Sequence, residues 1–319
     1  MPSEFDLIQR HFTRTAPNAV LGVGDDCALL QPGAGMQLAI STDTLVADVH
    51  FFADTDPHKL GWKSLAVNLS DLAAMGATPR WATLALTVPE VDDDWLAAFA
   101  GGVFHCADQY GVSLVGGDTT RGALSLTFTV IGEVPPNQAL RRDGAQPDDE
   151  IWVSGTLGDA ALALAVLQGR ANLTTPDLAT LAVRLHTPTP RVELGLALRG
   201  LASSAIDISD GLLADLGHIL SRSGVGARIE YALLPLGEIV HDYAAHPEFD
   251  ACVLNGGDDY ELCFTAPAEH HQAMNDVATR LDLRLTCIGR IHVEPGLNVC
   301  DAQGQALDIR CTGYDHFAA

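Results

Sequence analysis

Lysine is almost absent from this chain of 319 residues, which contains only Lys59 and Lys63. Basic residues number 18 and acidic residues 41, so the formal net charge is −23 at pH 7. Because charged residues make up only 18% of the chain and hydrophobic residues 47%, the negative charge reflects a shortage of cations, not a charge-rich, disordered composition. A protein of this charge does not favour nucleic acid or anionic lipid as a partner.

Several patterns that define other classes of protein are also missing. The longest apolar run, near residues 160–167, is far shorter than the roughly 20 residues that span a bilayer. Residues 1–10 include Glu4 and Asp6 and lack the apolar core of a signal peptide. The seven cysteines are odd in number and never spaced C-x-x-C, so we expect reduced thiols in a cytoplasmic protein, without a disulfide framework or a zinc site.

The usual phosphate-binding motifs are absent as well. There is no G-x-x-x-x-G-K-[ST] segment, and neither lysine lies in a glycine-rich loop, which excludes a P-loop enzyme. The protein-kinase motifs V-A-I-K, H-R-D and D-F-G are missing, as are G-x-S-x-G and H-E-x-x-H. If this chain uses ATP, acidic side chains must hold the metal ions that neutralise its phosphates.

The hydrophobic pattern predicts two α+β domains. In the first half we expect strands over 37–46, 81–88, 113–115 and 124–134 and helices over 58–75 and 94–110, the second closed by Gly111. In the second half we expect strands near 151–154, 205–208, 227–233, 261–265 and 284–291, a final hairpin near 297–309, and helices over 159–167 (with Asp159 at its cap), 190–201 and 210–223. The proline-rich segment 135–150 is typical of a boundary, which gives domains 1–138 and 139–319.

Aspartate occurs in six clusters beside glycine, serine or threonine, at residues 22–26, 41–43, 68–71, 116–120, 207–211 and 256–259. Each cluster alone is more typical of a turn or a helix cap than of a functional site. Six in one chain favour a second interpretation, the binding of a hard cation. Mg²⁺ prefers oxygen ligands and commonly bridges one or two carboxylates to substrate phosphates, and neighbouring hydroxyl and N–H groups can hold phosphate oxygens.

Taken together and in order, these segments resemble the thiamine-monophosphate kinases. The resemblance rests on GVGDDCA (22–28), STDTL (41–45), His50, AVNLSDLAAMG (66–76), GGDTT (116–120), AIDISDGL (205–212), GGDDYEL (256–262) and GYDHF (313–317). It implies the two-domain α+β fold of aminoimidazole ribonucleotide synthetase, selenophosphate synthetase and HypE, with an N-terminal sheet that pairs across a homodimer. It also implies transfer of a phosphoryl group from ATP to thiamine monophosphate, assisted by several Mg²⁺ ions.

The resemblance further assigns roles to individual residues. Metal ligands fall on Asp26, Ser41, Thr42, Asp43, Asp71, Asp118, Asp207 and Asp210, of which Asp43, Asp71, Asp118 and Asp210 are the catalytic candidates. Nucleotide contacts fall on Gly117, Asp118, Arg142 and Ser209, and thiamine-phosphate contacts on His50, Asp258 and Tyr314. One departure is visible, because the family usually has glutamate where this chain has Asp258.

The residues also leave other interpretations open, the first of which is another ATP-using enzyme of the same fold. A selenophosphate synthetase would show a glycine-rich loop with cysteine or selenocysteine within residues 1–20, and HypE would end in cysteine; this chain shows neither feature. A non-catalytic protein that binds divalent cations is another interpretation. A salt-adapted acidic surface is a third, which is compatible with the kinase assignment and fits runs such as residues 92–94.

Overall fold

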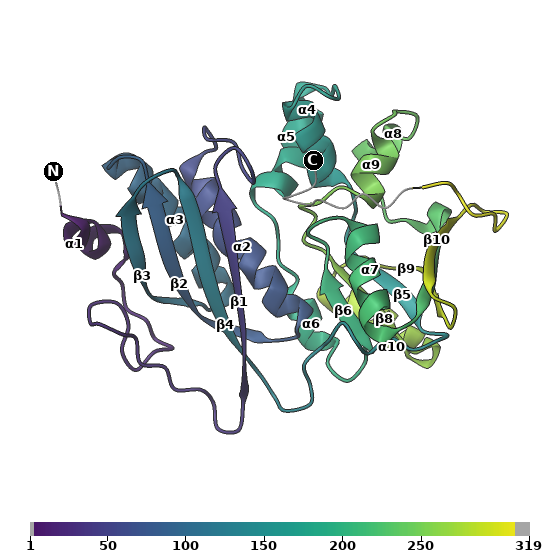
Figure 1. Cartoon of the computed structure of the whole chain (residues 1–319), viewed down its shortest axis with the longest axis horizontal. Coiled ribbons are helices and arrows are strands. Elements are labelled where there is room, and N and C mark those ends of the chain that lie inside the picture. The colour runs from purple at the N-terminus through teal and green to yellow at the C-terminus, as the bar shows by residue number, and fades with distance from the viewer. Residues whose placement is uncertain (1–2, 310–319) are drawn as a thin grey trace. The chain divides into compact units, whose positions relative to one another are not determined.

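The computed structural model describes residues 3–309, and the chain divides into two compact units (Figure 1). The first comprises Met1–Leu72 and Ala77–Asn137, and the second comprises Ala73–Gly76 and Gln138–Ala319. Each unit combines helices with its own β-sheet. The predicted α+β class is therefore confirmed.

The first unit contains a four-stranded sheet in the order β1-β4-β2-β3. Its strands are β1 (Gln37–Val46), β2 (Thr78–Val88), β3 (Ser113–Arg121) and β4 (Ser125–Val134), and its main helices are α2 (Pro57–Ala74) and α3 (Asp93–Tyr110), which cover one face (Figure 1). Only β2 and β3 pair in parallel. The predicted order of strands and helices is confirmed, but β3 continues to Arg121 instead of ending at Val115. Its polar second half is held by pairing with β2 through Val88 and Arg121.

Helices α2 and α3 pack closely because each presents a glycine to the other. A Cβ atom on Gly102 would lie 1.9 Å from the carbonyl oxygen of His58, and one on Gly61 would lie 2.1 Å from that of Phe99. Local signals fix the ends of α3. The Asp92 side chain accepts hydrogen bonds from the backbone N–H groups of the first turn, and Gly111 ends the helix with a left-handed φ of 67°.

The second unit contains a six-stranded sheet in the order β10-β7-β9-β5-β8-β6. The strands are β5 (Glu150–Ser154), β6 (Ser204–Asp207), β7 (Gly226–Glu230), β8 (Leu262–Ala266), β9 (Leu285–His292) and β10 (Gly296–Cys300). The helices are α4 (Asp159–Leu167), α5 (Thr175–His186), α6 (Val192–Ala197), α7 (Leu212–Ser223), α8 (Glu238–Asp242), α9 (Phe249–Leu254) and α10 (His271–Leu281). Residues 3–309 also include short helical segments, α1 (Glu4–Leu7) and η1 (Ile8–Phe12) in the first unit and η2 (Tyr231–Leu233) and η3 (Ala268–His270) in the second.

The second unit departs from the sequence predictions in several places. Helices α5, α8 and α9 were not predicted, although Thr174 caps α5 by accepting from the backbone N–H of Asp177. The cap of α4 is Gly158, and the Asp159 carboxylate accepts instead from the hydroxyl of Thr156. The predicted final hairpin is reduced, because β10 pairs with β7 and residue 300 makes only an isolated bridge to residue 306. Among residues 3–309, no helix is long and apolar enough to cross a bilayer.

The close packing of α2 and α3 can be tested by substituting two adjacent glycines of α3, Gly101 and Gly102. We expect Gly102→Ala to lower the free energy of unfolding by about 1–3 kcal/mol, because its Cβ would collide with backbone. Gly101→Ala is the matched control, since a Cβ there would lie 3.6 Å from the nearest neighbour, His58 Cδ2. Urea denaturation measures both variants. Equal stabilities would contradict the packing argument.

Candidate functional site

In the first unit, two acidic segments of the sequence meet where α2 lies against β1. The hydroxyl of Ser41 donates to Asp71 Oδ2 at 2.5 Å, and the backbone N–H of Asp43 donates to Asn68 Oδ1 at 3.0 Å. Asn68 is fully buried and its amide also donates to the carbonyl of Ser64. Helix α2 therefore contacts two of the predicted metal ligands of β1, Ser41 through Asp71 and Asp43 through Asn68.

Asp118 lies on a different part of the same sheet. Asp43 is opposite Phe128, Phe128 is opposite Leu84, and Leu84 pairs with Gly117, the neighbour of Asp118. Three strand spacings thus separate the backbones of β1 and β3, which is roughly 14 Å. A single Mg²⁺ binds its ligands at about 2 Å, so Asp43 and Asp118 of one chain cannot bind the same ion.

The remaining predicted residues of the first unit lie around these strands. The Thr42 hydroxyl is 2.9 Å from that of Thr129, across the open face of the sheet. Asp26 lies in an exposed loop and donates its N–H to Asp25 Oδ1. His50 follows β1, and its Nδ1 accepts from the backbone N–H of Val46 at 3.0 Å. In the neutral ring, the proton is therefore on Nε2.

In the second unit, Ser209 and Asp210 lie in the turn between β6 and α7, directly after the buried Asp207. Their backbone N–H groups both donate to Asp215 Oδ2, each at 3.0 Å. Asp215 is buried on α7, and burial raises the pKa of its carboxyl to about 7, although the two N–H donors oppose this shift. The cap residue of α7 is Gly211, which has no side chain with which to accept a hydrogen bond. The turn is thus fixed by a side chain of the following helix.

The segment 256–261 runs beside this turn and is bonded to it. The backbone N–H of Asp258 donates to the carbonyl of Ser209 at 3.0 Å, and that of Tyr260 donates to the carbonyl of Ile208 at 2.8 Å. The approach is close enough to require glycine, because a Cβ on Gly257 would lie 2.2 Å from the oxygen of Ser209. Ser209, Asp210 and Asp258 are therefore held together within this unit.

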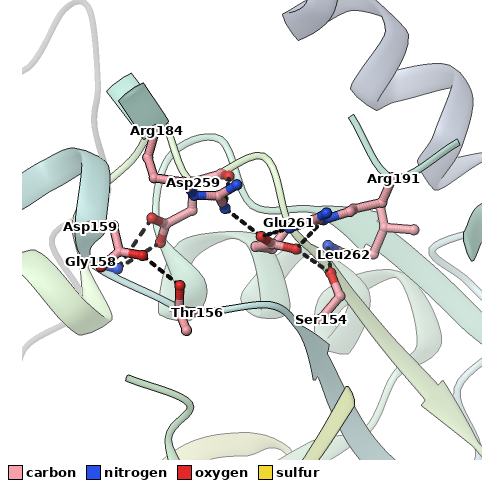
Figure 2. Close-up of polar contacts among 9 residues, drawn as sticks. All are labelled: Ser154, Thr156, Gly158, Asp159, Arg184, Arg191, Asp259, Glu261 and Leu262. Atoms are coloured by element: carbon pink, nitrogen blue, oxygen red, sulfur yellow. Dashed lines mark hydrogen bonds and ion pairs between the residues drawn. The ribbon is translucent and has the colours of Figure 1, made fainter. Parts of the chain in front are cut away.

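A buried polar cluster lies where this segment enters β8 (Figure 2). Glu261 is fully buried and accepts hydrogen bonds from Arg184, from Arg191 Nε at 2.6 Å, and from the hydroxyl of Ser154 at 2.5 Å. The neighbouring Asp259 accepts from the backbone N–H of Gly158 at 3.1 Å through both carboxylate oxygens.

Two of the predicted contact residues remain, Arg142 and Tyr314. Arg142 lies in the segment between β4 and β5, where its carbonyl accepts from the hydroxyl of Ser223 at 2.9 Å. Tyr314 lies outside the described residues.

Comparison with known proteins gives a consistent result along the chain. The family model for the N-terminal domain of AIR synthase related proteins matches residues 24–134, and the C-terminal model matches residues 146–300. A thiamine-monophosphate kinase of Salmonella typhimurium is 48% identical over 320 aligned positions, covering 99% of this chain and 98% of that protein. The chain belongs to the thiamine-monophosphate kinase family. The family consists of phosphotransferases, so the chain is an enzyme of that class.

Solved structures of the family agree with this membership. The crystal structure of the kinase from Stenotrophomonas maltophilia K279a has a TM-score of 0.85 and 52% identity, covering 91% of this chain and 93% of that one. A structure of AaThiL complexed with AMPPCP and TMP has a TM-score of 0.79 and 32% identity, covering 90% and 89%.

The donor set of this family member suits Mg²⁺ by its chemistry. The predicted ligands offer only carboxylate and hydroxyl oxygens, which hard cations prefer. Within residues 3–309, however, no three His, Cys, Asp or Glu side chains form a group that could hold an ion. Pairs such as Ser41 and Asp71 fit an ion that one or two protein groups hold while phosphates and water complete its shell.

The residues that support the site were not among those predicted from the sequence. Asp215 carried a usable signal, because it lies on the apolar side of α7 among Leu212, Leu216 and Ile219. Glu261 stood inside the GGDDYEL segment, but nothing local indicated that Arg184 and Arg191 would reach it from α5 and from the start of α6.

Asp259 generates a test of pH dependence. Burial raises the pKa of its carboxyl well above the ordinary value of 3.8, so above that pH the folded chain retains a proton that the unfolded chain has lost. This group therefore makes the free energy of unfolding fall as pH rises. We expect Asp259→Asn, which does not titrate, to be stabilised relative to the native protein as pH increases.

Urea denaturation at about pH 4.5 and about pH 7.5 measures this difference. Asp242→Asn, on an exposed carboxylate, is the control. Parallel pH dependences of Asp259→Asn and the native protein would show that Asp259 ionises normally in the folded state.

Proposed function

We propose that this protein transfers the γ-phosphoryl group of ATP to the phosphate of thiamine monophosphate, giving thiamine diphosphate and ADP, the last step of thiamine diphosphate synthesis. The 48% identity to a thiamine-monophosphate kinase along nearly the whole chain carries this proposal. The similarity to AaThiL complexed with AMPPCP, an analogue of ATP, and TMP supports the two substrates.

The transfer is direct. A phosphate oxygen of thiamine monophosphate attacks the γ-phosphorus, and the bond from that phosphorus to the bridging oxygen of ADP breaks. The acceptor is already anionic, so it needs orientation and charge neutralisation more than a general base. The GxSxG and HExxH motifs of activated nucleophiles and metallohydrolases are absent from the sequence, which favours a path without a covalent enzyme intermediate.

Mg²⁺ bound at the acidic residues would neutralise the phosphates of both substrates. In the first unit we assign this binding to Asp26, Ser41, Thr42, Asp43, Asp71 and Asp118, and in the second to Asp207 and Asp210. Asp43, Asp71, Asp118 and Asp210 are the catalytic candidates among them.

The protein's own groups orient the two substrates. We assign nucleotide contacts to Gly117, Asp118, Arg142 and Ser209, and thiamine-phosphate contacts to His50, Asp258 and Tyr314. The hydrogen bond from Asp258 N–H to the Ser209 carbonyl supports these assignments, because it holds a residue assigned to the acceptor next to one assigned to the nucleotide. This adjacency within one unit is what transfer between two phosphates requires.

We also propose a homodimer that forms through the open face of the four-stranded sheet. Ser41 and Asp43 point toward α2, so Leu38 and Ile40, at alternate positions of β1, point the other way. Their exposed fractions are 44% and 62%, high for apolar side chains on a sheet. Within one chain, the spacing between β1 and β3 keeps Asp118 too far from Asp43 to bind the same ion. A second copy would provide another Asp118.

The activity is tested by ADP release with Mg²⁺, ATP and thiamine monophosphate, against thiamine and other small monophosphates. We expect Asp71→Asn to lower turnover by roughly 100-fold or more, because the charge is lost. The amide oxygen can still accept from Ser41, so the melting temperature should stay unchanged. Asp54→Asn, on an exposed carboxylate of the same unit, should retain activity. No turnover above the alternative acceptors would reject the assignment, and near-normal turnover of Asp71→Asn would reject the role of Asp71.

The dimer is tested by light scattering after gel filtration. We expect the native protein to be a dimer and Ile40→Glu to be a monomer, because a charge would be buried at the contact. Val293→Glu changes a valine of the second unit that is 65% exposed, and should remain dimeric. A native monomer, or a dimeric Ile40→Glu variant, would exclude this face as the contact.

A further inference from the structure

Asp258 adopts a backbone conformation that needs external support. Its φ is 68° and that of Tyr260 is 49°, so two non-glycine residues of one short segment lie in the left-handed region. Such conformations are unfavourable for residues with a Cβ and persist only where surrounding contacts hold them. The contacts of segment 256–261 therefore determine where the Asp258 carboxylate points.

One of these contacts acts on the carboxylate itself. The hydroxyl of Tyr260 donates to Asp258 Oδ1 at 3.1 Å. The backbone N–H groups of both residues are bonded to the turn that contains Ser209. A side chain two residues along thus fixes the rotation of the carboxylate, while the backbone bonds fix its position.

The far end of the segment is held by the buried cluster in Figure 2. Arg184 donates to the carboxylate of Glu261 and, at 3.3 Å, to the carbonyl of Asp259, so one guanidinium contacts both residues that flank Tyr260. Arg191 binds Glu261 through two nitrogens, Nε at 2.6 Å and Nη2 at 2.5 Å. This paired geometry needs a planar guanidinium, which lysine cannot supply.

The cluster leaves the Glu261 carboxylate little freedom to move. A Cβ on Gly155 would lie 2.1 Å from Glu261 Oε1, so the backbone of that neighbour is packed against the carboxylate. The hydroxyl of Ser154 donates to Glu261 and accepts from the N–H of Leu262 at 2.9 Å, which ties the start of β8 to β5. The end of the segment is therefore anchored to the sheet as well as to the two arginines.

We propose that Tyr260 and Arg184 are positioning residues for the acceptor, acting through Asp258. The Tyr260 hydroxyl fixes the rotation of the Asp258 carboxylate. Arg184 stabilises the left-handed backbone of segment 256–261, which determines where that carboxylate lies. The shorter aspartate at position 258 makes this support more important, because its carboxylate reaches less far and has fewer rotatable bonds for correcting a misplaced backbone. This inference rests on the proposed function, in which Asp258 contacts thiamine monophosphate.

The proposal predicts an effect on one substrate. Tyr260→Phe removes only a hydroxyl, and we expect it to raise the KM for thiamine monophosphate by about three- to tenfold, the range expected for the loss of one hydrogen bond. Arg184→Lys should raise the same constant by about tenfold or more, since both contacts come from Arg184 Nη2, at the end of a side chain that the shorter lysine does not match. The KM for ATP should change less than twofold in both variants.

Matched controls separate this effect from general damage. Tyr231→Phe removes a hydroxyl that donates to Asp250, elsewhere in the same unit. Arg290→Lys replaces a guanidinium that pairs with Glu150 at 3.1 Å. Both controls should keep the native KM values. Melting temperatures are measured for every variant, and Tyr260→Phe alone carries the test if Arg184→Lys does not fold.

A double-mutant cycle decides whether Tyr260 acts through Asp258. In an Asp258→Ala background, which removes the acceptor of the Tyr260 hydroxyl, Tyr260→Phe should add little to the KM already raised by the first change. Full additivity would overturn the proposal, and so would native KM values in both Tyr260→Phe and Arg184→Lys. If the native protein does not phosphorylate thiamine monophosphate, the proposed function itself fails. If the native protein and both controls are active but the two variants are unaffected, only the positioning role fails.

Discussion

The ion pairs of Glu261 hold together the second unit's part of the candidate site. A fully buried carboxylate is costly unless cations and hydrogen bonds compensate it, and here two arginines and the Ser154 hydroxyl do so. Because the carbonyl of Glu261 also accepts a hydrogen bond from the N–H of Ile208, the same residue fixes the strand that leads into the turn with Ser209. One interaction thus positions both segments that carry the predicted nucleotide and acceptor contacts.

This construction explains how an acidic protein can act on anionic substrates. The arginines of the cluster bind a protein carboxylate, so their guanidinium groups serve the scaffold. Lys59 and Lys63 lie on α2, and the Lys63 side chain is buried. The predicted phosphate-facing residues are instead mainly aspartates, hydroxyl groups and backbone N–H groups. For such a site, the negative charge of the protein is useful only when cations accompany the substrates, which is why the proposed function requires Mg²⁺.

Much of the first unit was predictable because its signals are local. The apolar period of α2, the cap of α3 at Asp92 and its stop at Gly111 are each read from a few adjacent residues. The second unit was less predictable because its helices are short and are stabilised by contacts between distant segments. Helix α9 spans only Phe249–Leu254, too few residues for a periodic pattern to emerge.

The candidate site divides in the same way. The motifs identified which aspartates matter for the resemblance, but their order along the chain says nothing about which of them can share an ion. That depends on sheet register, where Asp43 and Asp118 lie on strands separated by two others. It depends equally on the left-handed backbone at Asp258, which is stabilised by contacts between distant residues, such as Arg184 with Glu261 (77 positions apart) and Ser154 with Glu261 (107 positions apart). Such long-range contacts form only when the chain folds, so a motif can specify the reacting groups while leaving the residues that orient them to the tertiary structure.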